Sequence, residues 1–471
     1  MEEVEISPTS PDRFEELLEP DRYRRFADAL DGAARALSGR TLWHINSTAE
    51  GGGVAEMLQS LLGYLRGVGI ETRWLVVEGN DEFFEVTKRL HNLLHGERVD
   101  GADVGEADRG VYERTLAANL PDARATISPG DVVILHDPQT VGLAPAVKEA
   151  GARSIWSCHV GVDDPNDLAR RAWDFLRPYV DQTMAHVFSR RAYAWEGLSA
   201  ERVAVIPPCI DAFSPKNQPL DQETVAAILR VSGVVPDAAG DGDPSFRRQD
   251  GTPAQVRRRA ELIEDEPIPA SSPLVAQVSR WDRLKDPVGV ITGFAGIEDD
   301  RTGAHLLMAG PAADSVADDP ESDEVLAEVR KVWGDLPAAI RRRVHVACLP
   351  MDDLDENAAS VNAVQRRGDV IVQKSLAEGF GLTVAEAMWK KRPVVGSRVG
   401  GIQDQIVDGE SGLLVDPDDP GEFARAVTTL LEDREAAARL GGAAHARVCE
   451  EYIPPRYLGR FMDLVDRVLA E

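Results

Sequence analysis

The chain has 471 residues, of which 43% are hydrophobic and 28% charged, the composition of a globular protein long enough for two domains of ordinary size. Its 52 basic and 80 acidic residues give a net charge of −28, which argues against nucleic acid or an anionic membrane as a partner. An acidic start without an apolar stretch excludes a signal peptide, and no run approaches the roughly 18 apolar residues of a membrane helix. Four cysteines lie far apart without any CxxC pair. We therefore expect a soluble protein of the cytoplasm.

Strands and helices alternate along the first 208 residues, the pattern of a parallel α/β sheet. Residues 12–38 come first, with apolar side chains at the spacing of one or two amphipathic helices. The sequence then predicts strands over residues 41–45, 73–77, 132–135, 154–158 and 203–206, and helices over residues 54–66, 83–94, 141–149 and 165–177. Two adjacent prolines, Pro207 and Pro208, mark the end of this domain.

Three consecutive glycines, Gly51, Gly52 and Gly53, stand between the first predicted strand and its helix. They do not form the G-x-G-x-x-G fingerprint of dinucleotide sites. Without side chains, however, they let the backbone approach a ligand closely, at the positive end of a helix. The turn is a candidate phosphate site, and the alternative is an ordinary flexible turn.

Polar residues follow two predicted strands of this domain. His136, Asp137 and Gln139 come after the strand over residues 132–135, and His159 follows the strand over 154–158. Ligands of parallel α/β sheets bind at the carboxyl ends of strands. A histidine at a strand end is on its own more often a structural hydrogen-bonding group. Asp137 and Gln139 are suited to hydrogen bonding with sugar hydroxyls.

The α/β alternation resumes in a second domain, residues 209–451. Gly, Asp and Pro are frequent in residues 232–273, which predicts an exposed, partly disordered insertion with one charged helical piece over 254–264. Strands are predicted over residues 274–278, 306–309, 344–348, 370–372 and 393–396, and helices over residues 287–297, from 383 onward, 422–431, 435–450 and 455–469.

Two cations, Arg280 and Lys285, lie in the loop between the strand over 274–278 and its helix, where Asp286 and Pro287 suit the N-cap and the first helical position. An arginine fork and a lysine point charge on one strand-to-helix loop can neutralise a diphosphate. The alternative is a pair of ordinary surface cations.

The stretch over residues 369–390 combines a short apolar strand, a glycine-containing loop and the start of a helix. Such a turn presents backbone N–H groups and a helix dipole to an anion. Glu378 and Glu386, eight residues apart, are poor phosphate ligands but good acceptors for sugar hydroxyls. The alternative for Glu386 is a capping box with Thr383. The candidate binding residues of the stretch are Glu378, Gly379, Phe380, Gly381, Leu382, Thr383 and Glu386.

The string EGFGLTVAE resembles the E-x7-E signature of retaining glycosyltransferases with the GT-B fold. Longer strings, HINSTAEGGGVAEML, HDPQ, QVSRWD and VQKSLAEGFGLTVAEAMWK, resemble the trehalose glycosyltransferring synthases and the retaining trehalose phosphorylases. The resemblance covers most of the chain outside the first 40 residues and residues 232–273. It implies two Rossmann-like domains facing a cleft: an acceptor domain (1–208, joined by the C-terminal helix 452–471) and a donor domain (209–451).

The reaction that this resemblance implies is reversible transfer of glucose from a nucleoside diphosphate glucose to glucose, forming trehalose. Arg280 and Lys285 would stabilise the leaving diphosphate, with Glu378 as the third catalytic residue holding the glucose 3-hydroxyl. Glu386 would bind the ribose and His159 the 6-hydroxyl. The backbones of Gly51 to Gly53 and Gly379 to Thr383 would complete the donor site. Asp137 and Gln139 are the acceptor-side candidates.

The resemblance implies small sugars and a nucleotide sugar as the partners, and it leaves a homodimer open. No cofactor or metal is expected, because no D-x-D motif stands at a predicted strand end, although Mg²⁺ would be free to stimulate activity. One alternative is a trehalose phosphorylase that uses inorganic phosphate. Others are a GT-B transferase with a different acceptor and, from another class, a non-catalytic sugar-nucleotide binding protein.

Overall fold

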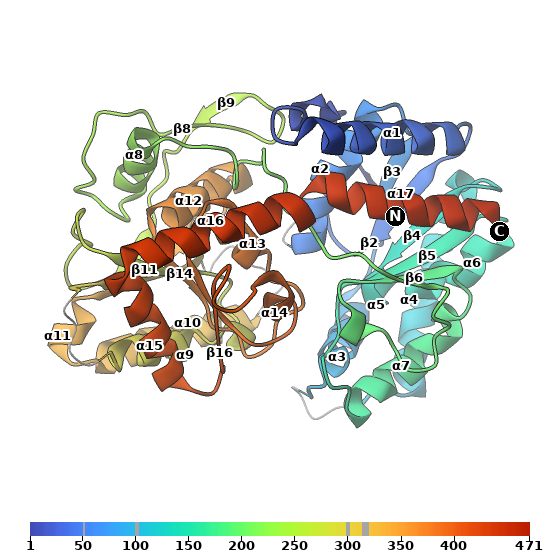
Figure 1. Ribbon diagram of the computed structural model, residues 1–471. Coiled ribbons are helices and arrows are strands. Elements are labelled where there is room, and N and C mark those ends of the chain that lie inside the picture. Colours follow the sequence, from blue (N-terminus) through green and yellow to red (C-terminus); the bar gives the residue numbers. More distant parts are fainter. Residues whose placement is uncertain (50–51, 99–102, 298–301, 313–319) are drawn as a thin grey trace. The chain divides into compact units, whose positions relative to one another are not determined.

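A computed structural model describes residues 1–49, 52–98, 103–297, 302–312 and 320–471, and the chain divides into two compact units (Figure 1). Unit 1 comprises Met1–Cys209 and Tyr452–Glu471, and unit 2 comprises Ile210–Glu451. The division between the units falls one residue after the paired prolines Pro207 and Pro208. No helix in the described ranges is long and apolar enough to cross a membrane.

Unit 1 is built on a seven-stranded sheet of order β1-β3-β2-β4-β5-β6-β7, in which only β1 runs antiparallel. The strands are β1 (Glu2–Val4), β2 (Leu42–Asn46), β3 (Thr72–Val76), β4 (Val132–His136), β5 (Arg153–Cys158), β6 (Ala185–Phe188) and β7 (Val203–Val205). Every residue of β2 and β4 is buried, as expected for central strands of a parallel sheet covered on both faces.

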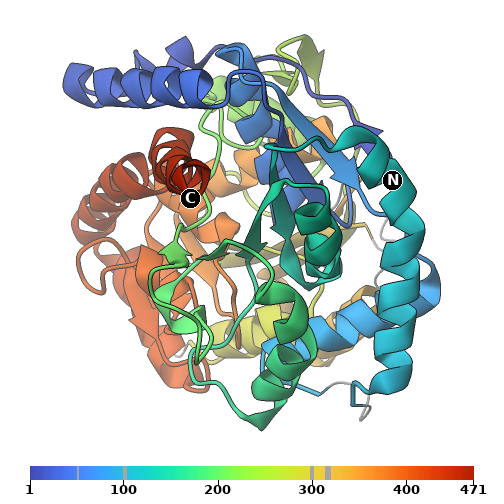
Figure 2. The ribbon, with the colours of Figure 1, turned by 90° about the vertical axis from the view of Figure 1, so that its right-hand side faces the viewer.

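The helical segments of unit 1 are η1 (Pro11–Phe14), α1 (Pro20–Ala36), α2 (Gly53–Gly67), α3 (Asp81–Leu94), α4 (Glu106–Thr126), α5 (Asp137–Thr140), η2 (Val141–Leu143), α6 (Ala144–Glu149), α7 (Asp167–Val180), η3 (Arg191–Tyr193) and α17 (Pro454–Ala470). The C-terminal helix α17 packs along α1, as Figures 1 and 2 show in red and dark blue. The helix predicted over residues 141–149 is confirmed over Ala144–Glu149, but its start is wrong. A 3₁₀ turn precedes α6 there, because Pro145 lacks an N–H and fits only the first turn of a helix.

Unit 2 contains a second seven-stranded sheet, of order β10-β13-β12-β11-β14-β15-β16, in which only β10 is antiparallel. Its strands are β10 (Glu261–Ile263), β11 (Leu274–Val278), β12 (His305–Pro311), β13 (Val344–Leu349), β14 (Val370–Gln373), β15 (Val394–Ser397) and β16 (Leu413–Val415). The helical segments are α8 (Gln222–Ser232), η4 (Arg283–Lys285), α9 (Pro287–Ala295), α10 (Pro320–Asp335), α11 (Ala338–Arg341), α12 (Leu354–Arg367), α13 (Leu382–Trp389), α14 (Ile402–Gln405), α15 (Pro420–Glu432) and α16 (Arg434–Glu451).

The segment over residues 232–273 is folded against the rest of unit 2, and its predicted helical piece is wrong. It forms the hairpin of β8 (Ser245–Arg247) and β9 (Pro253–Gln255), and β10 then joins the main sheet beside β13. Arg248 makes two hydrogen bonds of 2.9 and 2.6 Å to Asp353 at the start of α12. Phe246 is buried. Pairing with a sheet edge and a buried aromatic ring outweighed the charged, helix-favouring composition of this segment.

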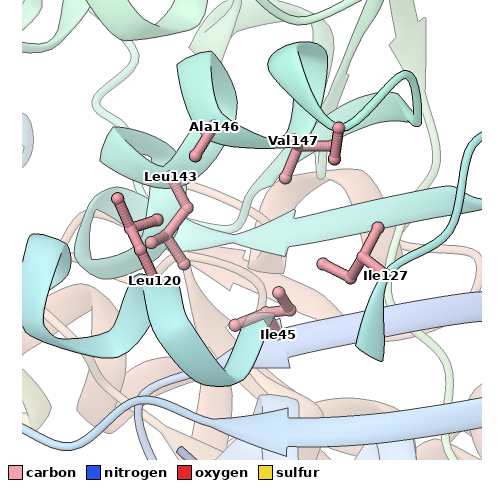
Figure 3. Close-up of a pocket in the computed structure, with 7 residues that line it drawn as sticks. Ile45, Leu120, Ile127, Leu143, Ala146 and Val147 are labelled. Atoms are coloured by element: carbon pink, nitrogen blue, oxygen red, sulfur yellow. The ribbon is translucent and has the colours of Figure 1, made fainter. Parts of the chain in front are cut away.

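A small apolar cavity lies in unit 1 where α4 and α6 cover β2 (Figure 3). Its lining is wholly apolar: Ile45, Leu120, Ile127, Leu143, Ala146, Val147 and Ala150. None of the candidate site residues belongs to this lining. The cavity is therefore a feature of core packing, and the candidate site has to be built from the strand ends.

Asp131, immediately before β4, holds the start of the unit 1 sheet together. Its buried carboxylate accepts hydrogen bonds of 2.9 Å from the indole N–H of Trp43 and from the backbone N–H groups of Thr41 and Ser128. Hydrogen bonds to a charged group are the strong ones, and their loss leaves donors unsatisfied.

We expect Asp131→Ala to lower the free energy of unfolding by about 3 kcal/mol, because a buried indole and two backbone donors lose their acceptor. Urea unfolding followed by tryptophan fluorescence measures this as a lower midpoint. The exposed Asp28→Ala is the matched control and should leave the midpoint in place. An equal midpoint for both variants would contradict the assigned role of Asp131.

Candidate active site

The strand order of unit 2 reverses between β11 and β14, which lie side by side in the middle of the sheet. In open α/β sheets, ligands bind outside the carboxyl ends of strands at this reversal. The loop after β11 carries Arg280 and Lys285, and the loop after β14 carries Glu378 and the glycines. Both sets of predicted donor-site residues therefore belong to the two loops that the topology favours.

Buried hydrogen bonds connect these two loops. The fully buried side-chain amide of Gln277 donates to the carbonyl of Lys285 at 2.9 Å and accepts from the backbone N–H of Lys374 at 3.2 Å. The backbone N–H of Leu376 donates to the carbonyl of Leu284 at 2.8 Å. These hydrogen bonds hold the two loops in one arrangement, as a preorganised site requires.

The structure brings Lys285 and Glu378 into direct contact. The Lys285 ammonium lies 2.7 Å from Glu378 Oε2, with only 18% and 10% of the two side chains exposed. Ser375 Oγ donates to the same oxygen at 3.3 Å. Arg280, on the same loop as Lys285, is 55% exposed, and its guanidinium lies 3.5 Å from Asp282. A partly buried cation and a carboxylate thus stand together, and the loop of the cation also carries a more exposed arginine.

The glycine loop makes a tight turn into α13. Gly381 is the N-cap residue with φ of +86°, a conformation that favours glycine, and a Cβ there would lie 3.1 Å from Cγ of Glu378. The carbonyl of Phe380 accepts a hydrogen bond of 2.5 Å from the Gln405 amide. Because Gly381 has no side chain to cap the helix, the first turn, beginning at Leu382, can offer its N–H groups to an anion.

Glu386 is buried in the middle of α13, with 1% of its side chain exposed. Its Oε2 accepts from the Gln365 amide at 3.1 Å, and its Oε1 lies 3.6 Å from the ammonium of Lys216. The capping-box alternative is wrong, because the helix already begins at Leu382. In addition, the Thr383 hydroxyl donates to the Gln373 amide oxygen at 2.9 Å.

Sequence reasoning missed a second buried pair across the same loops. Lys374, only 4% exposed, pairs with the carboxylate of Asp286, which has φ of +46° and caps α9 by accepting the N–H of Gly289 at 3.0 Å. A lysine directly after an apolar strand is rarely buried without a partner. The position of Lys374 in the sequence therefore indicated that it pairs with an acidic residue. The predicted N-cap role of Asp286 is confirmed.

In unit 1, the predicted polar residues gather at the neighbouring ends of β4 and β5. Asp137, with φ of +59°, accepts the backbone N–H of His159 at 2.7 Å. The rings of His136 and His159 lie nearly parallel, 11° apart, with centroids separated by 5.8 Å. Gln139 is half-buried, and its Oε1 has no hydrogen-bond partner among the described residues.

A further histidine, His44 in β2, extends this cluster into the core and was not predicted. Its Nδ1 lies 3.0 Å from Nε2 of His136, and both rings are buried. Burial lowers the pKa of His44 to about 3 and that of His136 well below its usual range. Both imidazoles are therefore neutral at pH 7, and one must donate to the other.

The glycine triplet lies at the start of α2, where Gly52 is the N-cap residue and Gly53 the first helical residue. Gly52 has an extended backbone, with φ of −160°, so its conformation does not itself require glycine. Gly51 lies outside the described residues. No group of three or more His, Cys, Asp or Glu in the described parts of the chain could hold a metal ion.

Comparison with known proteins identifies the class. A family model described as the N-terminal domain of trehalose synthase matches residues 44–195, and one described as glycosyl transferases group 1 matches residues 354–447. An E. coli structure described as trehalose-6-phosphate bound with UDP-2-fluoro glucose superposes with a TM-score of 0.68 and 12% identity, covering 91% of this chain and 99% of that one. Fold and family matches together define a glycosyltransferase with the GT-B fold.

Relatives that match along more than nine-tenths of the chain identify the family within this class. The trehalose synthase of Pyrococcus horikoshii is 34% identical over 92% of this chain and 91% of its own length. The chain belongs to the trehalose synthase family. The trehalose phosphorylase of Pleurotus pulmonarius is more distant, at 24% identity, and this chain spans about half of it, 54% of its length.

The two buried histidines predict a pH dependence of stability. Between pH 6.5 and about 3, residue 44 of the unfolded chain binds a proton that the folded chain does not, so stability falls as the pH falls. From pH 7 to pH 5, His44 alone should cost about 2 kcal/mol. We expect His44→Phe to lose less stability than the wild type over this interval, measured by urea unfolding at both pH values. Equal losses of stability in the wild type and in His44→Phe would show that His44 is protonated in the folded state.

Proposed function

We propose that the protein is a retaining glucosyltransferase that moves glucose reversibly between a nucleoside diphosphate and glucose, with trehalose as the disaccharide. The observation that carries the proposal is the contact between Lys285 and Glu378 at the strand reversal of unit 2. A nucleoside diphosphate sugar contains both a dianionic diphosphate and a set of hydroxyls. The Lys285 ammonium complements the diphosphate, and the Glu378 carboxylate complements the hydroxyls. A bound donor would separate these two side chains and give each of them a new partner.

Charge stabilisation at the leaving group is the main catalytic contribution in this proposal. As the glycosidic bond breaks, negative charge grows on the diphosphate, and Arg280, Lys285 and the N–H groups at the start of α13 lie on the loops that face it. The acceptor hydroxyl attacks from the face that the diphosphate leaves, and its proton passes to a phosphate oxygen. This route needs no covalent carboxylate nucleophile of the kind that retaining glycosidases use.

Each remaining residue is assigned to the part of the substrates that it binds. Glu378 holds the 3-hydroxyl of the transferred glucose, Glu386 the ribose, and His159 the 6-hydroxyl. The acceptor glucose is bound by Asp137 and Gln139, and Gly51 to Gly53 approach the diphosphate. We propose further that the enzyme works in the cytoplasm on small sugars, without cofactor or essential metal. Mg²⁺ would act only as a stimulant, and a homodimer remains compatible with this scheme.

One comparison supports a nucleotide sugar as the donor, and another supports trehalose as the disaccharide. The E. coli structure with the same fold is described as bound with UDP-2-fluoro glucose. The relatives that match more than nine-tenths of this chain at 34% identity are trehalose synthases. The base of the donor is identified by the reaction of trehalose with ADP, UDP or GDP.

A second candidate, phosphorolysis of trehalose, is favoured by one observation. The Glu386 carboxylate is nearly inaccessible and already contacts Lys216 and Gln365, so a ribose cannot reach it without moving a side chain. Inorganic phosphate, which lacks a ribose, would use only Arg280, Lys285 and the start of α13. We place this candidate second because the phosphorylase relatives are the more distant ones.

The deciding experiment incubates the purified protein with trehalose and, in separate reactions, ADP, UDP, GDP or inorganic phosphate. We expect mass spectrometry to detect a nucleoside diphosphate glucose and to rank the three bases. Glucose 1-phosphate formed only with inorganic phosphate would establish the second candidate instead. Turnover in none of the four reactions would contradict trehalose as the disaccharide.

Arg280→Ala tests the stabilisation of the leaving group. Loss of one donor aimed at developing charge lowers kcat by about 10²–10³-fold in comparable sites. Arg283→Ala is the matched control. Arg283 lies on the same loop, has similar exposure, and its guanidinium lies 2.8 Å from Glu328. Near-normal turnover of Arg280→Ala, or an equal loss in both variants, would contradict the assigned role.

A further inference from the structure

Lys216 lies in a segment of unit 2 whose backbone is held in place by side chains of two helices. The carbonyls of the residues around it accept hydrogen bonds from side chains of α12 and α13: Asn362 to Pro215 and Gln218 (3.0 and 2.9 Å), Arg366 to Gln218 (2.9 Å) and Trp389 to Asn217 (3.0 Å). Lys390 also donates to the Asn217 side chain at 2.9 Å. Because its backbone is fixed, the Lys216 ammonium can change position only through rotations about the bonds of its aliphatic side chain.

The side chain of Lys216 is the more accessible member of its pair with Glu386. Of the two side chains, 21% of Lys216 but only 1% of Glu386 is exposed. The other carboxylate oxygen of Glu386 is occupied by Gln365. A ligand that is to reach Glu386 therefore meets Lys216 first. At 3.6 Å, the pair is longer than a hydrogen bond, a separation that small rotations of the lysine stem change.

A carboxylate and an ammonium side by side complement a vicinal diol. The carboxylate accepts hydrogen bonds from the hydroxyl groups, and the ammonium donates a hydrogen bond to a hydroxyl oxygen. The ammonium also offsets the cost of burying the Glu386 charge, which would be large without a partner. A ribose satisfies both groups at once, whereas a sugar that lacks one hydroxyl leaves one of them without its new partner.

We propose that Lys216 is a specificity-determining residue that binds the ribose of the nucleotide together with Glu386. This inference rests on the proposed function, in which the donor is a nucleoside diphosphate sugar. Lys216 turns away from Glu386 as the ribose enters, and it donates a hydrogen bond to the 2′-oxygen. The resulting preference is for ribonucleotides over their 2′-deoxy counterparts.

The test measures binding by isothermal titration calorimetry on the full chain. The probes are the nucleoside diphosphate that the wild type binds best among ADP, UDP and GDP, and its 2′-deoxy form. We expect the wild type to prefer the ribonucleotide by about tenfold or more, the loss that follows when a site built for a hydroxyl lacks it. Lys216→Met should reduce the preference to within about threefold, by weakening ribonucleotide binding more than deoxynucleotide binding.

The control is Lys331→Met, a lysine of unit 2 that is 79% exposed and paired with Asp335, which should keep the full preference. If Lys216→Met does not fold, the double variant Lys216→Met, Glu386→Gln removes both charges and avoids an unpaired buried carboxylate. Its ratio of ribo- to deoxynucleotide affinity is then compared with that of Glu386→Gln alone, and a lower ratio in the double variant supports the inference.

Two results would overturn the role of Lys216 while leaving the proposed function intact. One is a wild type that binds both nucleotides equally. The other is an unchanged ratio of affinities after removal of Lys216, including an equal weakening of both, as a purely structural role would give. A wild type that binds no nucleoside diphosphate would instead overturn the proposed function, and the inference with it.

Discussion

The buried amide of Gln277 is the interaction on which the geometry of the candidate donor site depends. It donates to one loop of unit 2 and accepts from the other, and together with the hydrogen bond from Leu376 to Leu284 it fixes the relative height of the two strand ends. Lys285 and Glu378 then meet because their loops have no freedom to separate. A site whose cation and carboxylate come from strands about 90 residues apart in sequence needs such a link, because main-chain pairing between β11 and β14 ends before the loops begin.

Three lysines of unit 2 each pair with a largely buried carboxylate. In a protein with 80 acidic and 52 basic residues, three lysines of this unit are placed one by one against carboxylates: Lys285 with Glu378, Lys374 with Asp286, and Lys216 with Glu386. Each carboxylate is largely buried, and each lysine offsets part of the desolvation cost. The local field at the strand ends is therefore set by these pairs and by Arg280, and much less by the net charge.

The sequence predicted the parallel α/β architecture because the central strands are buried on both faces and read as short apolar runs between helical patterns. It missed α4, whose apolar residues follow no clear helical period and which contains Pro121. It also predicted a helix over residues 254–264, where strand pairing with β13 prevails. Local composition could not reveal that pairing, because the partner strand lies more than 80 residues further along the chain.

The candidate site was predictable to the extent that its residues stand at strand ends, as Arg280, Lys285, Glu378, Asp137 and His159 do. The buried contacts around these residues were not predictable. The contacts of Glu386 with Lys216, of Lys374 with Asp286, and of His44 with His136 join residues that are 88 or more positions apart. Only the fold brings such side chains together, and no spacing in the sequence indicates which pairs form.

The strands β1 and β10, which run antiparallel to their neighbours in the two seven-stranded sheets, occupy the same structural position, each at an outer border of an otherwise parallel sheet. Both are three residues long, as are β7 and β16 at the opposite borders. A border strand with so few unpaired N–H and C=O groups is a poor template for the addition of a strand from another molecule. Four short borders thus protect both seven-stranded sheets against association by edge pairing, independently of the repulsion that the charge of the protein provides.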